Sequence, residues 1–289
     1  MRRMLLIGIL VVAGAAGIYA RQPASGPTPF ADIIKVKDNL YVVRQGGGNT
    51  AVFVTQTGVV LVDTKLPGWG ERIMQQVRTV TDKPVTMIVN THTHGDHVGS
   101  NEYFPASVEI VAHANTKANM TRMPSFAGEK AQFLPDRTYT DALTIGSGDD
   151  RIDLRHFGRG HTDGDTIVVF PALRVAHTGD LFASKGTPLI DVKNGGSGVA
   201  YPETLKKATA GITNVDTVIP GHHDPVPFGT FVEFGEFNMA FLTAVRQAFE
   251  AGRVPSQAAS ELKLPDRFRD YTMGNTQANI NVIYGELKK

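Results

Sequence analysis

Three histidines and one aspartate fall within six residues of this chain, in the segment NTHTHGDH at positions 90–97. The β-branched run before this segment predicts a strand, so these side chains are expected in a loop at the strand's C-terminal end. His92 and His94 are two residues apart, and on extended backbone they point to the same side and can bind one metal ion. Asp96 and His97 then face a second position. Imidazole and carboxylate groups in this pattern suit metals such as zinc.

Candidate ligands also stand at three places in the second half of the chain. His161 lies between glycines in GRGHTDG, where the backbone can approach a metal closely. Asp180 ends the segment VAHTGD, and His222 follows VIPG. Because each stands at the end of a predicted strand, we expect a site shared between the two halves of the chain. The alternative interpretation of the 90–97 segment, an exposed histidine-rich loop, does not account for these downstream ligands.

The rest of the sequence predicts two similar halves, each with strands followed by helices. In the first half, short β-branched runs predict strands at 40–44, 51–55, 59–63, 85–90 and 108–112. In the second half, the predicted strands are 151–157, 166–170, 173–177 and 215–219. Helical spacing of apolar residues is found at 70–81, from 115 onward and at 202–210. This order of elements implies sheets packed inside helices.

The C-terminal part has a different character and predicts a helical extension over residues 230–289. Apolar residues are spaced for one face of a helix at 237–249 and again at 276–287. Ser256 is expected to cap a short helix between these two.

The N-terminus has the pattern of an export signal. Arg2 and Arg3 precede an uncharged stretch over residues 4–20 that ends in small residues. We expect residues 1–20 to be a signal peptide cleaved after Ala20, which would make the protein periplasmic or secreted, with an uncleaved membrane anchor as the alternative. Residues 21–32 contain three prolines and are expected to form a flexible lead-in.

Composition excludes several classes of function. The chain has no cysteine, so thiolate metal ligands, disulfides and a cysteine nucleophile are ruled out. The formal net charge is +1, which provides no basic surface for a nucleic acid. The expected partner is therefore a small-molecule substrate, with no membrane contact beyond the N-terminal anchor. The sequence does not indicate an oligomeric state.

The order of these segments resembles the metallo-β-lactamase superfamily of hydrolases over about residues 33–229. The resemblance rests on LVDT at 61–64, the histidine segment, GHT at 160–162, TGD at 178–180 and PGH at 220–222. It implies an α+β four-layer αββα sandwich as the catalytic domain, with the C-terminal helices as an appendage. It also implies that Asp63 orients the histidine loop. The implied ligands are His92, His94 and His161 for a first metal, Asp96, His97 and His222 for a second, and Asp180 as a bridge between them.

The function that this resemblance implies is an exported binuclear zinc hydrolase, with iron or manganese as alternative metals. A hydroxide that bridges two Zn²⁺ ions would attack a small ester, lactone, thioester or amide. Asp96 is the residue expected to orient this nucleophile and to transfer its proton.

Three alternatives remain open at this stage. A true β-lactamase is favoured by the export signal and disfavoured by Asp180 in the bridging position. A mononuclear iron enzyme similar to the persulfide dioxygenases fits the ligand types, although the chain offers ligands for two metals. A non-catalytic metal-binding module is less consistent with so many ligands, since a closed structural zinc site needs only four.

Substrate specificity is expected to depend on the loops at 46–49, 67–70, 124–135 and 185–199. Within these loops, Lys185 is a candidate for substrate binding, and Trp69 either covers the pocket or packs at the start of a helix. Of the remaining histidines, His113, His156 and His177 are expected to be structural. His223 is expected either to line the pocket or to play no part in it.

Overall fold

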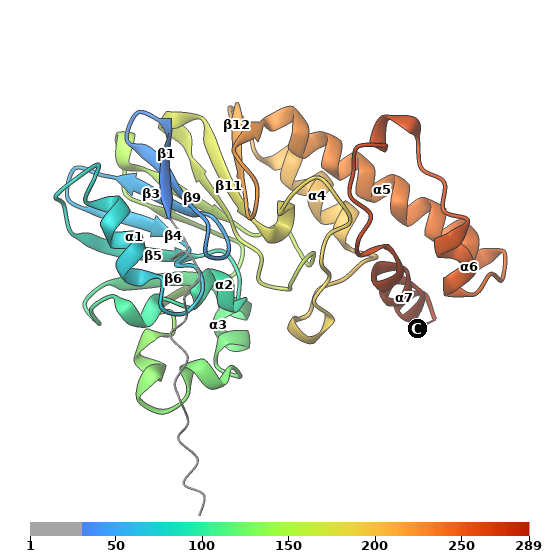
Figure 1. The fold of residues 1–289 in the computed structure, drawn as a ribbon, viewed down its shortest axis with the longest axis horizontal. Helices are drawn as coiled ribbons and strands as arrows, with labels where there is room; N and C mark the ends of the chain where they lie inside the picture. The colour runs from blue at the N-terminus through green and yellow to red at the C-terminus, as the bar shows by residue number, and fades with distance from the viewer. Residues whose placement is uncertain (1–30, 289) are drawn as a thin grey trace, which may run out of the picture. The chain divides into compact units, whose positions relative to one another are not determined.

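Residues 31–288, which the computed structural model describes, contain thirteen strands in two mixed sheets (Figure 1). The seven-stranded sheet has the order β1-β2-β3-β4-β5-β6-β7. Its strands are β1 Asp32–Lys37, β2 Leu40–Arg44, β3 Thr50–Val54, β4 Val59–Val62, β5 Val85–Asn90, β6 Glu109–His113 and β7 Arg137–Tyr139. The six-stranded sheet has the order β13-β12-β11-β10-β9-β8. Its strands are β8 Ala142–Ile145, β9 Ile152–Arg155, β10 Ile167–Phe170, β11 Val175–Gly179, β12 Thr217–Pro220 and β13 Val226–Pro227.

Both faces of the central strands are buried, which accounts for their unbroken apolar sequences. In β4, Val60 and Val62 face the other sheet, whereas Val59 and Leu61 face the helix layer. The helices of this first half are α1 Gly70–Val77, α2 Gly95–Val98 and α3 Ala114–Met120, and α1 packs on the seven-stranded sheet. On the six-stranded sheet lie α4 Tyr201–Gly211 and the first half of α5 Phe228–Glu250. The predicted four-layer αββα sandwich is thereby confirmed.

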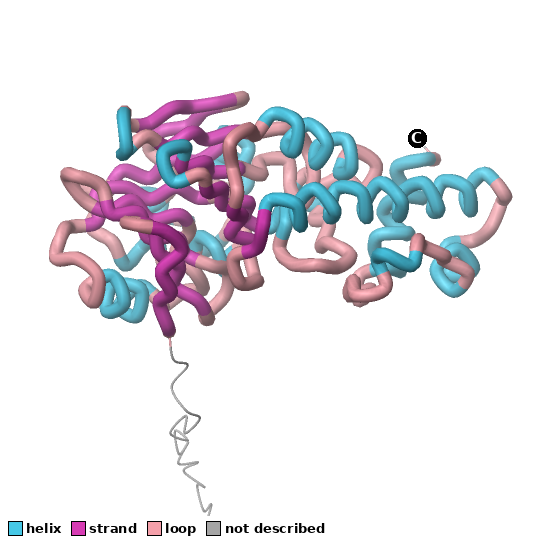
Figure 2. The backbone as a smooth tube through the Cα atoms, turned by 90° about the horizontal axis from the view of Figure 1, so that it is seen from above, coloured by secondary structure: helices cyan, strands magenta, loops and turns pink. Residues whose placement is uncertain are grey.

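The C-terminal helices form a further cluster beside the sandwich. Helix α5 continues past the sheet, and its second half packs against α6 Pro255–Ser260 and α7 Thr276–Leu287 (Figure 2). The long helix begins at Phe228, nine residues before the predicted start at Phe237, because Phe231 and Phe234 continue its apolar face onto the six-stranded sheet. The expected boundary between residues 229 and 230 therefore falls inside this helix.

Several other boundaries differ from the sequence prediction. Asp32 opens β1 and Ala31 is buried, so the last two residues of the expected lead-in belong to the folded part. The third strand of the second half starts at Val175 instead of Leu173, because Arg174 has a left-handed backbone, with φ of 57°. Ser256 does not cap α6, which already begins at Pro255. Strands β1, β7, β8 and β13 were not predicted. Strand β1 is only half buried and mixes apolar with charged residues, and the other three have two to four residues and no long apolar run.

The expected signal peptide at 1–20 and most of the lead-in lie outside the described residues. Within residues 31–288, no helix combines the length and the apolar character that a membrane span requires.

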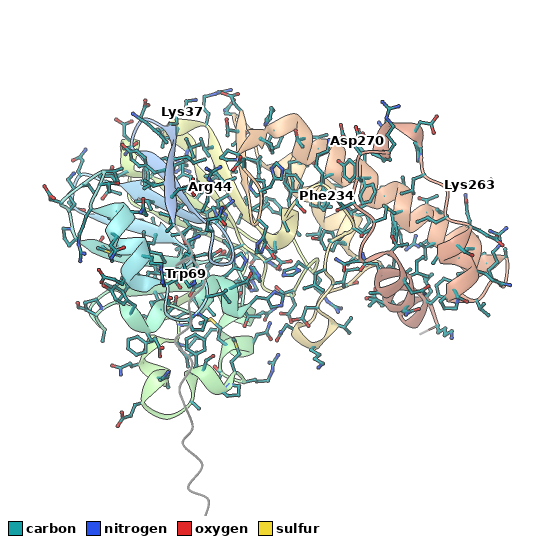
Figure 3. All side chains as sticks on the ribbon, in the orientation of Figure 1. Lys37, Arg44, Trp69, Phe234, Lys263 and Asp270 are labelled. Carbon is teal, nitrogen blue, oxygen red and sulfur yellow. The ribbon has the colours of Figure 1, made fainter. Side chains whose placement is uncertain are left out.

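We expect Phe234→Ala to reduce the free energy of unfolding by about 3–5 kcal/mol, because it leaves a cavity where α5 meets the sheet. Phe234, labelled in Figure 3, is 1% exposed and packs against Phe182, Tyr201 and Phe237. Denaturant unfolding followed by circular dichroism measures the change. Val232→Ala, two residues away on the exposed face, is the control, and a similar loss in both variants would contradict this packing argument.

Candidate metal centre

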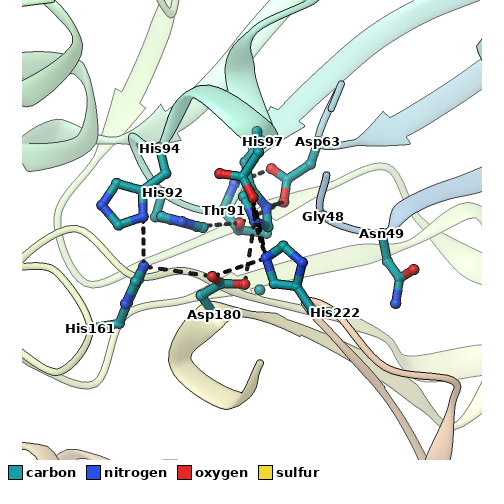
Figure 4. A network of polar contacts seen from close by, with 12 residues as sticks. Gly48, Asn49, Asp63, Thr91, His92, His94, His97, His161, Asp180 and His222 are labelled. Atoms are coloured by element: carbon teal, nitrogen blue, oxygen red, sulfur yellow. Dashed lines mark hydrogen bonds and ion pairs between the residues drawn. The ribbon is translucent and has the colours of Figure 1, made fainter. Parts of the chain in front are cut away.

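The structure brings all seven candidate ligands together at the ends of strands from both sheets. Figure 4 labels six of them, His92, His94, His97, His161, Asp180 and His222. His92 and His94 follow β5, and Asp96 and His97 lie on the short helix α2. The other sheet supplies its ligands from loops at strand ends, with His161 before β10, Asp180 directly after β11 and His222 after β12.

The first ligand group consists of three histidines whose free nitrogens converge. His161 Nε2 lies 2.9 Å from His94 Nδ1. His92 Nε2 is buried and has no hydrogen-bond partner. Ligand atoms of His92, His94, His161 and Asp180 all lie within 4.8 Å of one another. Because two imidazole nitrogens are held face to face and a third is buried without a partner, this geometry fits a cation between them.

The opposite nitrogen of each of these histidines is held by the protein. His94 Nε2 donates to Asp191 Oδ2 at 2.7 Å, and His161 Nδ1 donates to the carbonyl oxygen of Leu189 at 2.8 Å. The Thr91 hydroxyl lies 3.0 Å from His92 Nδ1. These contacts fix the tautomer and direct the remaining lone pair of each ring toward the metal position.

The second ligand group contains Asp96, His97 and His222, and Asp180 adjoins both groups. His222 Nε2 lies 3.3 Å from Asp96 Oδ2 and 3.3 Å from Asp180 Oδ2. Asp180 Oδ2 is also 3.8 Å from His161 Nε2 in the first group. Asp180 Oδ1 is buried without a hydrogen bond, 3.3 Å from His97 Nε2. The carboxylate therefore stands between the two groups, where it can contact a metal in either.

Asp63 joins the end of β4 to the histidine loop. Its buried carboxylate accepts hydrogen bonds from Thr91 N at 2.8 Å, Thr91 Oγ1 at 2.7 Å and His97 Nδ1 at 2.7 Å. This is the orienting contact that the sequence analysis expected. Its backbone has φ of +65°, a conformation that aspartate tolerates better than most residues.

Burial lowers the pKa of some histidines of the centre, and neighbouring carboxylates raise the pKa of another. Burial lowers the pKa of His161 to about 4 and that of His92 well below its usual value, so both rings are neutral at pH 7, as metal ligands must be. Burial also opposes a charge on His222, but hydrogen bonds to Asp180 and Asp96 raise its pKa to about 9. A metal at this position therefore competes with a proton.

Two glycines permit the close packing around the ligands. A Cβ atom at Gly48 would overlap the His97 ring, and one at Gly221 would overlap the Asp180 carboxylate. These glycines are needed for the approach of neighbouring chain segments and not for flexibility.

Other predicted residues have different positions. His177 donates to the carbonyl oxygen of Asn49 at 3.3 Å and is structural, as expected. Lys185 Nζ lies 3.2 Å from Glu233 Oε1 of α5, so the structure pairs this side chain with the helical extension. Trp69 is buried among the apolar residues under α1 and does not cover the pocket. His223 lines a cavity of about 350 Å³ together with His222.

The remaining two histidines form a pair away from the ligands. His113 and His156 stack with ring centroids 4.1 Å apart, and His113 Nε2 donates to the carbonyl oxygen of Thr140 at 2.7 Å. These contacts are structural, as expected.

Asp191 is the residue of the centre that sequence reasoning missed. It lies within the 185–199 loop that was expected to affect specificity, but it has no motif of its own. Its backbone N–H donates to the carbonyl oxygen of His161 at 2.9 Å, so it contacts two ligand residues at once. Only the folded chain brings it 2.7 Å from a histidine 97 positions earlier.

Comparisons with known proteins show the family of the chain. Residues 43–222, more than half of the chain, match the metallo-beta-lactamase superfamily. The chain therefore belongs to this superfamily of metal-dependent hydrolases.

The relatives carry the names of different enzymes. The chain is 28% identical over 229 residues to a metallo-beta-lactamase type 2 of Elizabethkingia meningoseptica, covering 73% of this chain and 86% of that protein. It is 27% identical over 180 residues to the alpha subunit of a 2,4-dinitroanisole O-demethylase of Nocardioides sp. (strain JS1661), covering 60% of this chain and 51% of that protein.

Solved structures agree on the fold. The sec-alkylsulfatase Pisa1 from Pseudomonas sp. superimposes with a TM-score of 0.76 at 14% identity, over 89% of this chain and half of that protein's length. The DIM-1 metallo-beta-lactamase superimposes with a TM-score of 0.62 at 18% identity, over 73% of this chain and 98% of its own.

We expect Asp191→Ala to weaken zinc binding about 10–100-fold, the usual effect of removing a group that orients a histidine ligand. Asp191→Asn keeps an acceptor oxygen and should lose less. Competition with a fluorescent zinc chelator measures the affinity. Asp163→Ala is the matched control, because the Asp163 backbone N–H bonds the same loop, at Asn194 O, but its carboxylate accepts from Asn119 and not from a ligand. Unchanged affinity in Asp191→Ala would contradict the orienting role.

Proposed function

We propose that this chain is a binuclear zinc hydrolase that acts on a small ester, lactone, thioester or amide. The observation that carries the proposal is the position of Asp180, with one carboxylate oxygen between His161 of the first group and His222 of the second. A single closed metal site needs only four ligands, whereas seven are gathered here.

The chemistry of the ligands favours zinc. The donors are imidazole nitrogens and carboxylate oxygens, and within residues 31–288 there is no thiolate. Zinc bound at these positions would polarise the oxygen of an attacked carbonyl and provide hydroxide near neutral pH. His92, His94 and His161 would hold the first ion, and Asp96, His97 and His222 the second, with Asp180 shared.

The chain's own residues would bind and orient the reactants around this centre. Asp96 is the residue placed to move a proton, since its side chain is only partly buried, with 30% of it exposed. Burial works against its charge, but the hydrogen bond from His222 keeps its pKa below the usual value, so it is ionised at neutral pH. An ionised carboxylate can accept a proton from an attacking water and pass it to a leaving group.

Hydrolysis of β-lactams is the second candidate function. It is supported by the relatives named metallo-beta-lactamase type 2, from Elizabethkingia meningoseptica and from Bacteroides fragilis, the latter 25% identical over 177 residues. Two features count against this function. The chain has no cysteine and so cannot form a second metal site with a thiolate ligand, and Asp180 stands in the bridging position instead.

We further propose that the protein is exported. The support is the order of two arginines, an uncharged stretch and small residues in the first 20 positions.

We expect the purified protein to bind about two zinc ions, to lose hydrolysis on chelation and to regain it with zinc. Elemental analysis gives the metal content, and nitrocefin, a lactone, a thioester and a p-nitrophenyl ester form the substrate panel. His222→Ala removes a ligand of the second group only and should lower the content to about one ion. About one iron with no hydrolysis of any substrate would overturn the proposal in favour of a redox enzyme, and nitrocefin as the best substrate would select the β-lactamase.

We expect Asp96→Asn to lower kcat about 10²–10⁴-fold, because the amide cannot accept a proton. Zinc content measured on the same sample separates this loss from loss of the second ion. The control is Asp149→Asn, the same substitution at an exposed aspartate in the 3₁₀ helix Gly148–Asp150. A kcat close to that of the wild type at full zinc content would exclude Asp96 as the proton carrier.

A further inference from the structure

The loop at 185–199 is tied to the C-terminal helical extension at both of its ends. At the first end, Thr187 N donates to the carbonyl oxygen of Thr272 at 2.8 Å. Asn275 Nδ2 donates to the carbonyl oxygen of Thr187 at 3.1 Å, and the buried Asn279 of α7 donates to that of Pro188 at 2.9 Å. These bonds hold the start of the loop against α7.

At the second end, one carboxylate accepts three hydrogen bonds. Glu286 of α7 accepts from Ser197 Oγ at 2.8 Å, Gly198 N at 3.1 Å and Val199 N at 2.9 Å. Glu286 stands in the last turn of α7, where the helix dipole disfavours a negative charge. It also lies just ahead of the N-terminus of α4, where such a charge is favoured. The three donors make this a specific anchor.

Between these ends, the loop forms one side of the metal centre. The carbonyl oxygen of Leu189 accepts from His161, and Asp191 accepts from His94. Two large apolar side chains near Asp191 are exposed to solvent, Leu189 at 55% and Val192 at 54%. They are the two most exposed large apolar side chains among the described residues. Because the Leu189 carbonyl and the Asp191 carboxylate contact ligand histidines, these two exposed apolar groups belong to a segment that adjoins the ligands.

The helices that hold this loop are an addition to the common fold. The superfamily match ends at residue 222, before α5, α6 and α7 begin. The superposition with the DIM-1 β-lactamase includes 98% of that protein but only 73% of this chain. The superposition with the alkylsulfatase includes 89% of this chain.

We propose that α7 is a positioning element that fixes the 185–199 loop as an apolar wall of the active site. An apolar group of the substrate, such as an acyl or alkyl chain, lies against Leu189 and Val192 while the scissile bond is at the metal centre. The inference rests on the proposed hydrolase function and adds to it the class of substrate, one with an aliphatic group. Glu286 acts through the loop and does not touch the substrate.

The first experiment tests the anchor by hydrogen–deuterium exchange on the purified protein. We expect Glu286→Ala to speed exchange of the loop amides at least about tenfold, because the donors Gly198 N and Val199 N lose their acceptor. Glu286→Gln keeps an acceptor oxygen and should restore most of the protection. Glu250→Ala, an exposed glutamate at the end of α5, is the control. Unchanged exchange in Glu286→Ala would overturn the anchor.

The second experiment tests the wall with a pair of substrates and a pair of ligands. On the zinc-loaded protein, we expect kcat/KM for p-nitrophenyl octanoate to exceed that for the acetate about tenfold, the effect of burying about two methylene groups. Octanohydroxamic acid should bind more tightly than acetohydroxamic acid by a similar factor. Leu189→Ser combined with Val192→Ser should abolish both preferences for the octanoyl group, whereas Val254→Ser, at 53% exposed on the helical extension, should change neither preference.

Variants of Glu286 test the anchor, and variants of Leu189 and Val192 test the wall. Glu286→Ala should reduce the octanoate preference, Glu286→Gln should restore it, and adding Glu286→Ala to the Leu189 and Val192 double variant should cause no further loss. Equal binding of the two hydroxamic acids by the wild type would overturn the wall. Selective binding of octanohydroxamic acid with no hydrolysis of any substrate in the panel would support the wall and overturn the hydrolase function on which the inference rests.

Discussion

The buried carboxylate of Asp63 is the contact on which the rest of the centre depends. It binds the backbone and hydroxyl of Thr91 and the ring of His97, so one side chain sets both the path of the loop after β5 and the direction of a ligand. A charge this deeply buried is stable only when it is fully hydrogen bonded. Since His92 follows Thr91 directly, the orientation of the first ligand group depends on the same contact.

The two sheets meet at this centre, and each supplies ligands that the other cannot. The seven-stranded sheet provides the loop with His92, His94, Asp96 and His97, and the six-stranded sheet provides His161, Asp180 and His222. The apolar core between the sheets holds these loops at a fixed distance. A cation bound by both sets would link the two halves of the sandwich, so that binding energy also becomes folding energy.

The C-terminal helices contact the metal centre through the 185–199 loop. Asp191 contacts His94 at one side of that loop, and Glu286 holds its end from α7. The extension is therefore not a separate appendage in physical terms, because α5 packs on the six-stranded sheet with its first half and on α7 with its second. A change in α7 can reach the ligands through a few hydrogen bonds between rigid elements.

Local sequence patterns predicted most of the strands, sheets packed inside helices, and the segments that carry imidazole and carboxylate groups. The four-layer sandwich and the set of seven ligands were implied by the resemblance of those segments to a known superfamily. Which residues orient these side chains, and what surrounds them, depends on the packed structure. Asp191, Leu189 and Glu286 have no local pattern, because their roles come from contacts across 28 to 97 positions that exist only once the sheets and helices have packed. The start of helix α5 could not be predicted for the same reason. It depends on Phe231 and Phe234, which pack on the six-stranded sheet.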